Sequence, residues 1–189
     1  MEPHDSSSPD LAAFRDYLLV LVRGQIPASM RARLDASDIV QQTLLEAHRK
    51  RDQYYGPNEP QQFAGWLRQI LSYNLLDAFR REQSERRDVR REIDIQNSLE
   101  QSAMGLENLL VADDSSPSQR VDRRLMALRL AGAIESLPEE QRQSIILRYC
   151  HQSSLEEIAE QLEKSKPAVA GLLKRGLASL RERFLKASP

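Results

Sequence analysis

The sequence is poor in the side chains that build disulfide frameworks and metal sites. Its 189 residues include one cysteine, Cys150, and three histidines. A lone cysteine cannot form an internal disulfide, and the histidines lie too far apart along the chain to form a cluster of metal ligands. The sequence therefore predicts no metal site, no redox chemistry and no cofactor.

Long apolar runs are absent as well. No run approaches the roughly 20 apolar residues that a membrane-spanning helix needs. The first residues, Met1 to Asp5, lack the basic and apolar regions that a signal peptide carries. We therefore expect a cytoplasmic protein without membrane insertion.

Glycine (7 residues) and aromatic residues (5%) are also scarce, whereas charged residues reach 29% of the chain. Leu, Arg, Glu, Gln and Ala are abundant, and their side chains lose little freedom in a helix. The length of the chain suits two domains of roughly 70 residues each. We predict an all-α fold of two small helical domains joined by a flexible acidic linker, with a helix-turn-helix in the C-terminal domain.

The charges are segregated along the chain, although 27 Lys and Arg residues nearly balance 28 Asp and Glu residues. Six arginines lie between Phe79 and Arg91, and cations dominate again from Lys166 onward. Between these basic poles, residues 93–119 contain five acidic residues and no Lys or Arg. The distribution of charge, rather than its sum, indicates two regions that suit anionic partners.

Apolar spacing and breaker residues divide the chain into segments. Helices are predicted in the first half over about 10–23, from about Asp35, and over about 62–87, and Asp52 to Pro60 is predicted to be a loop. The predicted segments are a disordered tail over 1–9, a first helical domain over 10–90, a linker over 91–120 and a second helical domain over 121–187.

The C-terminal part carries the pattern of a helix-turn-helix. Ser154 and Glu157 fit a capping box, in which the serine oxygen accepts from the third residue's amide and the glutamate reaches back. A turn at 163–165 separates the short helix that they open from a longer amphipathic one. An ordinary helical hairpin with a solvated charged face is the alternative for this segment alone. The outer face of the longer helix suits entry into a major groove, and its residues are Lys166, Ala170, Gly171, Lys174 and Arg175.

Two stretches of the chain resemble separate regions of the sigma factors of the extracytoplasmic-function (ECF) class of the sigma-70 family. The upstream stretch resembles the family's polymerase-binding segment over Asp35 to Thr43, and its minus-10 helix over Phe63 to Leu67 and Tyr73 to Arg81. The order of these regions and the linker between them also match, and the joint match is far more specific than either alone. The downstream stretch resembles the domain that recognises the minus-35 promoter element, on Leu137 to Glu140, Ile145 to Tyr149, Leu155 to Ala159, Val169, Leu180 and Arg181.

The resemblance implies a transcription initiation factor that is not an enzyme. Such a factor binds core RNA polymerase through the clamp helices of the largest subunit and through the flap, directs the polymerase to promoter DNA, and helps open the minus-10 region. By the resemblance, Asp38, Gln41 and Gln42 bind the polymerase from the exposed side of a helix. Members of the family are often held by an anti-sigma factor, and no residue of this chain identifies one.

The minus-10 contacts that the resemblance implies combine stacking and hydrogen-bonding side chains. An extruded base needs a pocket, and the loop from Tyr54 to Pro60 corresponds to the one that forms this pocket in the family, with Tyr55 as a further stacking partner. Trp66 lies on the apolar stripe and is assigned to the core. Amide, carboxylate and guanidinium groups gathered on one helix face can bind bases and phosphates. The residues assigned to minus-10 DNA are Tyr54, Tyr73, Asn74, Asp77, Arg80 and Arg81.

The predicted recognition helix departs from the family in one respect. Where members often place a basic or hydroxylated residue, this chain has Ala170 and Gly171, and Pro167 stands in the first turn. Glycine within a helix costs about 1 kcal/mol relative to alanine. Lys174 and Arg175 are therefore the strongest candidates for contacts with minus-35 DNA.

Two other classes of protein remain open from the sequence. A free-standing helix-turn-helix regulator would bind an operator through the C-terminal domain, but this hypothesis leaves the upstream resemblance unexplained. A helical adaptor would be indifferent to DNA and to salt. An enzyme is disfavoured, because the sequence contains no glycine-rich phosphate loop, no metal cluster and no nucleophile beside a suitable base.

Overall fold

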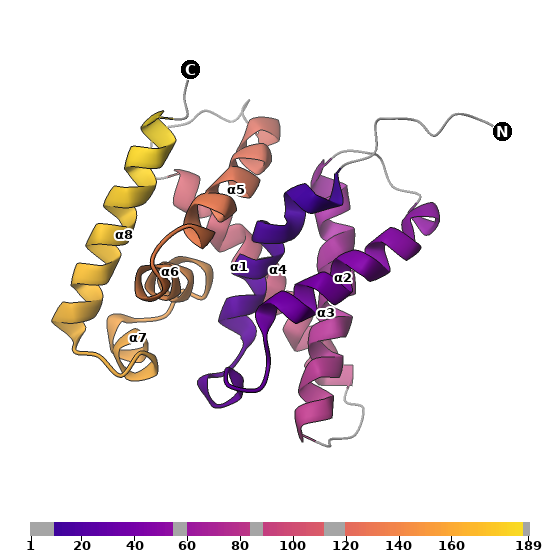
Figure 1. Cartoon of the computed structure of the whole chain (residues 1–189), viewed down its shortest axis with the longest axis horizontal. Helices are drawn as coiled ribbons and strands as arrows, with labels where there is room; N and C mark the ends of the chain where they lie inside the picture. Colours follow the sequence, from indigo (N-terminus) through magenta and orange to yellow (C-terminus); the bar gives the residue numbers. More distant parts are fainter. Residues whose placement is uncertain (1–9, 55–59, 84–88, 112–119, 187–189) are drawn as a thin grey trace.

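The structure is a computed structural model that describes residues 10–54, 60–83, 89–111 and 120–186 (Figure 1). Every regular element in these ranges is helical, so the predicted all-α fold is confirmed. The predicted tail, 1–9, lies outside the described residues. The elements are η1 (Leu11–Phe14), α1 (Arg15–Gln25), η2 (Ala28–Met30), α2 (Ala36–Arg49), η3 (Arg51–Gln53), α3 (Pro60–Gln83), α4 (Val89–Val111), α5 (Arg120–Glu135), α6 (Glu139–Ile145), the π-helical turn η5 (Ile146–Cys150), α7 (Leu155–Gln161) and α8 (Lys166–Lys186).

Helix α1 lies at the centre of the fold. The six consecutive residues from Tyr17 to Val22 are each at most 5% exposed, so α1 is buried on all sides rather than along one stripe. Such a helix is stable only where other helices cover it completely. Helices α2, α4 and α5 pack around α1 and provide that cover.

Helix α2 begins where the sequence predicts, because Asp35 caps it. The Asp35 Oδ1 atom accepts a hydrogen bond from the Ser37 backbone N–H at 2.7 Å, which satisfies one of the amides that a helix start leaves without a partner. Helix α2 packs along α3. The predicted apolar stripe of α3 faces the core, with Leu67, Leu71 and Leu75 fully buried.

Helix α4 occupies much of the segment that the sequence predicts to be a flexible linker. Its Leu99, Ala103 and Leu106 recur at helical spacing and are at most 4% exposed, so α4 has an apolar stripe of its own. The Gln25 side chain fastens α1 to α4, accepting from Ser98 Oγ at 2.9 Å and donating to Ser102 Oγ at 3.2 Å. The rest of the predicted linker, beyond residue 111, lies largely outside the described residues.

The helix-turn-helix is formed by α7 and α8, as predicted. The Ser154 Oγ atom accepts from the Glu157 backbone N–H at 3.2 Å, and Glu157 Oε2 accepts from the Ser154 backbone N–H at 2.7 Å. The latter hydrogen bond lowers the pKa of Glu157. Glu163 ends the first helix in the left-handed region, with φ 53°, and the chain then enters α8.

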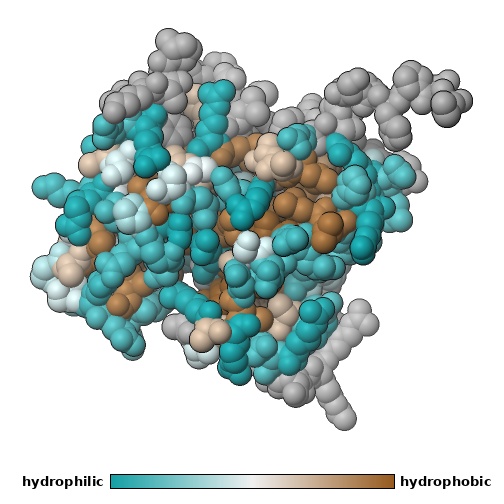
Figure 2. Space-filling view, viewed as in Figure 1, coloured by the Kyte–Doolittle hydropathy of each residue, from teal (hydrophilic) through white to brown (hydrophobic). Residues whose placement is uncertain are grey.

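The N-terminal and C-terminal parts of the chain share one core. Helices α1 and α4 pack directly against α5 and η5, and a single cluster of buried apolar residues extends from Phe14 to Leu180. On the face drawn in Figure 2, hydrophilic residues cover most of the surface and hydrophobic residues gather over α1 and α2. The two predicted helical domains therefore lie against each other.

Candidate nucleic-acid and polymerase interfaces

The predicted polymerase-binding residues lie on the outer face of α2. Asp38, Gln41 and Gln42 are exposed, whereas Ile39 and Val40 between them are buried. The spacing of three and four residues places the three polar side chains next to one another on one helix face. The structure thus brings all three together at the surface.

The same face of α2 carries an apolar residue that the sequence prediction missed. Leu45 is 46% exposed and follows Asp38 by seven residues, which returns it to the same side of the helix. The sequence signal that identifies Leu45 as exposed is its position on the polar stripe of α2 and not on the buried stripe. Asp38, Gln41, Gln42 and Leu45 are called the α2 face below.

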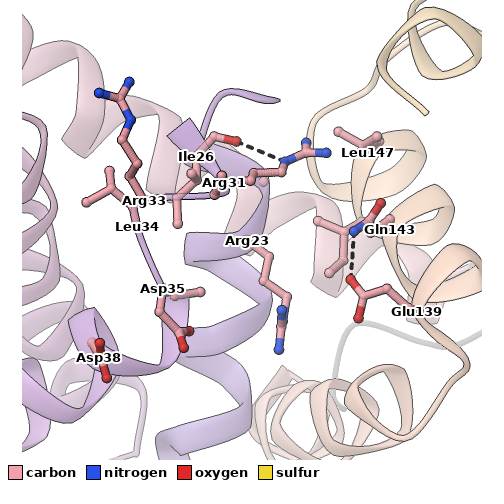
Figure 3. Close-up of a pocket in the computed structure, with 14 residues that line it drawn as sticks. Arg23, Ile26, Arg31, Arg33, Leu34, Asp35, Asp38, Glu139, Gln143 and Leu147 are labelled. Carbon is pink, nitrogen blue, oxygen red and sulfur yellow. Dashed lines mark hydrogen bonds between the residues drawn. The ribbon is translucent and has the colours of Figure 1, made fainter. Parts of the chain in front are cut away.

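One end of the α2 face borders a cleft between the two parts of the chain (Figure 3). The cleft has a volume of about 450 Å³, and Asp35 and Asp38 line it from the N-terminal side. Glu139 and Gln143 of α6 line it from the C-terminal side, where Gln143 Nε2 donates to Glu139 Oε1 at 2.7 Å. Asp38 therefore lies at a point where the C-terminal part of the chain is close by.

The predicted minus-10 residues of α3 fall into an exposed set and an inward set. Tyr73 is 47% exposed, and Asp77 and Arg81 are also exposed. Asn74 is half-buried, and its Nδ2 atom donates to Thr43 Oγ1 and to Glu46 Oε2 of α2, each at 3.2 Å. The structure therefore brings these residues to one end of α3, with Asn74 turned toward α2.

Arg80 lies between the exposed and the inward residues. Its side chain is 24% exposed, and its Nη1 atom donates to Asp77 Oδ1 at 3.2 Å. The Nε and Nη2 atoms of Arg80 are buried and have no hydrogen-bond partner in the part of the chain that the structure describes. Buried donors of this kind are costly unless a further acceptor reaches them.

Tyr54, the first residue of the predicted base pocket, belongs to an aromatic cluster. Its ring centroid lies 5.3 Å from that of Phe63 and 5.1 Å from that of Trp66. Phe63 in turn contacts Phe14 at 5.4 Å, edge to face. Trp66 packs against the core, as predicted. Tyr55 and the rest of the predicted pocket, 55–59, lie outside the described residues.

The predicted minus-35 residues lie along the outer face of α8. Lys166, Ala170, Lys174 and Arg175 are exposed and Gly171 is half-buried, whereas the opposite side is in the core. Lys166 forms an ion pair with Glu156 of α7. A Cβ atom at Gly171 would lie 3.2 Å from Arg175 Nη1, so the Arg175 guanidinium rests against this glycine. Because Gly171 has no side chain, the Arg175 guanidinium can lie beside it.

Two further properties bear on function. Across the described ranges, no group of three or more His, Cys, Asp and Glu side chains comes together in a way that would hold a metal ion. None of the helices in those ranges combines the length and the apolar character needed to cross a membrane.

Comparison with known proteins matches both parts of the chain to one family. Residues 15–85 match the model of sigma-70 region 2, and residues 127–180 match the model of sigma-70 region 4. Among solved structures, that of CnrH in complex with the cytosolic domain of CnrY is 20% identical, with a TM-score of 0.34, and the match covers 95% of this chain and 100% of that one.

Two curated relatives carry the family name. The ECF RNA polymerase sigma factor SigE of Mycolicibacterium smegmatis is 29% identical over 154 residues, which are 82% of this chain and 53% of the relative. The ECF RNA polymerase sigma factor SigF of Caulobacter vibrioides is 30% identical over 182 residues, which are 94% of this chain and 89% of the relative. The chain therefore belongs to the ECF sigma factors of the sigma-70 family, which bind RNA polymerase and direct it to promoters.

Proposed function

We propose that the α2 face is the surface through which this sigma factor binds core RNA polymerase in the cytoplasm, on the clamp helices of the largest subunit. The observation that carries this proposal is the exposure of Asp38, Gln41, Gln42 and Leu45 on one side of a helix whose other side is buried. Polar groups around one exposed apolar side chain are a common composition for a protein-binding patch.

The exposed end of α3 is proposed to bind the minus-10 element and to help part its strands. Tyr73 offers a ring on which an unpaired base can stack. The exposed guanidinium of Arg81 offers hydrogen bonds to phosphates and base edges, whereas the two donors of Arg80 that lack a partner in the described residues are buried and reach DNA only if the side chain turns outward. Asn74 acts here as a positioning residue, because its amide bonds to Thr43 and Glu46.

Tyr54 is proposed to support the same DNA surface from the aromatic cluster. Its ring is only partly buried although it packs on Phe63 and Trp66. A ring held on two sides loses little conformational entropy when a base stacks on the part of it that stays accessible. Its removal should therefore weaken DNA opening without removing polymerase binding.

The outer face of α8 is proposed to bind minus-35 DNA, with the flap of the polymerase as a further contact of the C-terminal part. Lys174 and Arg175 point to solvent one turn or less from Ala170 and Gly171. Small residues at the start of such a helix allow the backbone to approach a groove closely, while the long cations reach the phosphates beside it.

The test is reconstitution with core polymerase and a promoter library in which strand opening is mapped. Asp38→Arg with Gln41→Ala should abolish polymerase binding. Arg80→Ala with Arg81→Ala should keep polymerase binding and lose strand opening. Gln69→Ala, at an exposed position elsewhere on α3, is the matched control and should behave as the parent does. The site assignments are wrong if both double variants transcribe normally, and tight binding of a defined duplex without polymerase would favour a free-standing regulator.

A further inference from the structure

The packing of α8 fixes which of its sides faces outward. Val169, Leu172 and Leu173 are each at most 8% exposed and belong to its buried side. A Cβ atom at Gly176 would lie 3.1 Å from Ile145 Cγ1, so α6 packs closely on α8 at this glycine. The side of α8 opposite Gly176 is therefore the side that can enter a DNA groove.

Two ion pairs hold the start of α8 on its neighbours. The Nζ atom of Lys164, in the turn before α8, lies 2.7 Å from Glu140 Oε1 of α6. Lys166, the first residue of α8, forms an ion pair with Glu156 of α7. Because Lys166 already has an acidic partner, it is less available to a base edge than a cation without one. Base contacts by the start of α8 therefore depend on the residues that follow Lys166.

The outward side of the first two turns of α8 is built from small apolar residues. Pro167, Ala168 and Ala170 are exposed, and Gly171 is half-buried. Across residues 167–173, no side chain carries a hydrogen-bond donor or acceptor. The start of the second helix is the part of a helix-turn-helix that reaches base edges. Base recognition by these turns must therefore use apolar contacts.

One base edge in the major groove offers an apolar partner for such contacts. Among the four bases, thymine alone carries a methyl group there, and apolar side chains recognise it. Pro167 and Ala170 are three residues apart, so they are neighbours on one helix face and lie about 4.5 Å apart along the axis. Successive base pairs are about 3.4 Å apart. The two side chains can therefore reach neighbouring base pairs, and Gly171 beside them lets the helix approach the groove closely.

We propose that α8 recognises its DNA element through the methyl groups of thymines at neighbouring base pairs, which Pro167 and Ala170 contact. The inference rests on the proposed binding of minus-35 DNA by α8. Lys174 and Arg175, which are exposed on the same helix, bind phosphates and supply affinity without sequence preference. Burial of one methyl group strengthens binding about fourfold, so two thymines together should contribute about 15-fold.

The first experiment removes the methyl groups from the DNA and leaves the protein unchanged. The chain is reconstituted with core polymerase, and a library of minus-35 sequences identifies the preferred element. Each thymine of that element is then replaced by deoxyuridine, which lacks only the methyl group. We expect neighbouring thymines in the element, on either strand, and a loss of about fourfold in affinity at each of them. An element without neighbouring thymines, or losses below about 1.5-fold at every uracil, would overturn the inference.

The second experiment assigns each methyl group to a residue. Ala170→Gly should lower the loss caused by uracil at one of the two thymines to less than about 1.5-fold, because the Cβ atom that contacts the methyl group is removed. Pro167→Ala should lower the loss at the other thymine. Ala178→Gly is the matched control, since Ala178 is exposed about two turns further along α8 and its replacement costs the same helix propensity; its losses should equal those of the parent.

The variants also separate this inference from the proposed role of α8. Unchanged losses in both Ala170→Gly and Pro167→Ala would overturn the methyl contacts and leave phosphate binding by α8 intact. Normal promoter binding by Lys174→Ala with Arg175→Ala, on a library without any minus-35 preference, would instead overturn the proposed role of α8.

Discussion

Helices α3 and α8 each bring two neighbouring cations to the surface, but the surrounding structure supports them differently. In α3, Asn74 is bonded to two side chains of α2, and Arg80 is bonded to Asp77 and partly buried. In α8, Lys174 and Arg175 are exposed, and the Arg175 guanidinium lies beside Gly171.

The difference shows how one residue type can serve two kinds of DNA contact. A side chain that is already fixed loses little entropy on binding, so it can hold a base in one geometry. A long exposed cation contributes mainly through its charge, wherever a phosphate lies within reach. We therefore expect the α3 residues to act on a specific DNA conformation and the α8 residues to act on affinity.

The largest expected effect concerns the stability of the whole fold, which is common to α3 and α8. His151 is half-buried against Gly24, and desolvation lowers the pKa of the imidazole from 6.5 to about 4. Below pH 6.5 the unfolded chain therefore takes up a proton that the folded chain does not. The free energy of unfolding should fall by about 3 kcal/mol between pH 6.5 and pH 4, measured by urea unfolding. His151→Gln should flatten this dependence, whereas His48→Gln, at an exposed position, should leave it unchanged.

The next effect compares the two cation pairs directly. Arg80→Ala with Arg81→Ala should slow strand opening by about 100-fold, the value of two charge-assisted hydrogen bonds, measured by fluorescence of a base analogue in the minus-10 element. Lys174→Ala with Arg175→Ala should instead weaken binding on all promoters alike and lower the salt dependence by about two phosphate contacts. Equal losses of opening in both variants would contradict the distinction.

A smaller effect concerns the support of the α3 residues. Asn74→Ala should lower the free energy of unfolding by about 1–2 kcal/mol, because Thr43 and Glu46 lose a partner at a half-buried position. Lys174→Ala should change it by less than about 0.5 kcal/mol, as exposed substitutions usually do. Chemical denaturation of both variants measures the difference, and a similar loss for both would show that α3 is no better fixed than α8.

The smallest effect concerns Gly171. Gly171→Ala should stabilise the chain by about 0.5–1 kcal/mol through helix propensity, because the atom that the new Cβ meets is the movable end of Arg175. Thermal unfolding measures this gain. A loss of stability would mean that Arg175 is fixed after all, and the contrast between α3 and α8 would then weaken.

The parts of the fold that the sequence could predict are those with local chemistry. Asp35 and the pair of Ser154 with Glu157 start helices through hydrogen bonds within one turn, so their residue types alone identify them. The packing of α4 was not predicted, because Leu99, Ala103 and Leu106 form a weak stripe whose value depends on partners distant in sequence.

The closure of the two parts was unpredictable for a related reason. In the sequence, Gly24 marks the end of the first helix, yet α1 continues through it to Gln25. Its role follows from the His151 side chain that packs on it, and that of Gly105 from the backbone of Tyr149 and Cys150, and no local pattern encodes either contact. The residue types of the interfaces could be predicted from their places on a helix face. The exposure of Leu45 and the inward orientation of Asn74 could not, because they depend on how α2 packs on α3.

The π-helical turn η5 joins α6 to the helix-turn-helix, and its His151 backbone N–H donates to the Ile146 carbonyl five residues earlier, at 3.2 Å. A π turn takes up one more residue than an α turn. Deleting one residue there would restore an ordinary helix and rotate α7 and α8 by about 100° relative to α6. The five residues of η5 thus fix the orientation of the DNA-reading module, and length variation should be far less tolerated here than in the turn at 163–165.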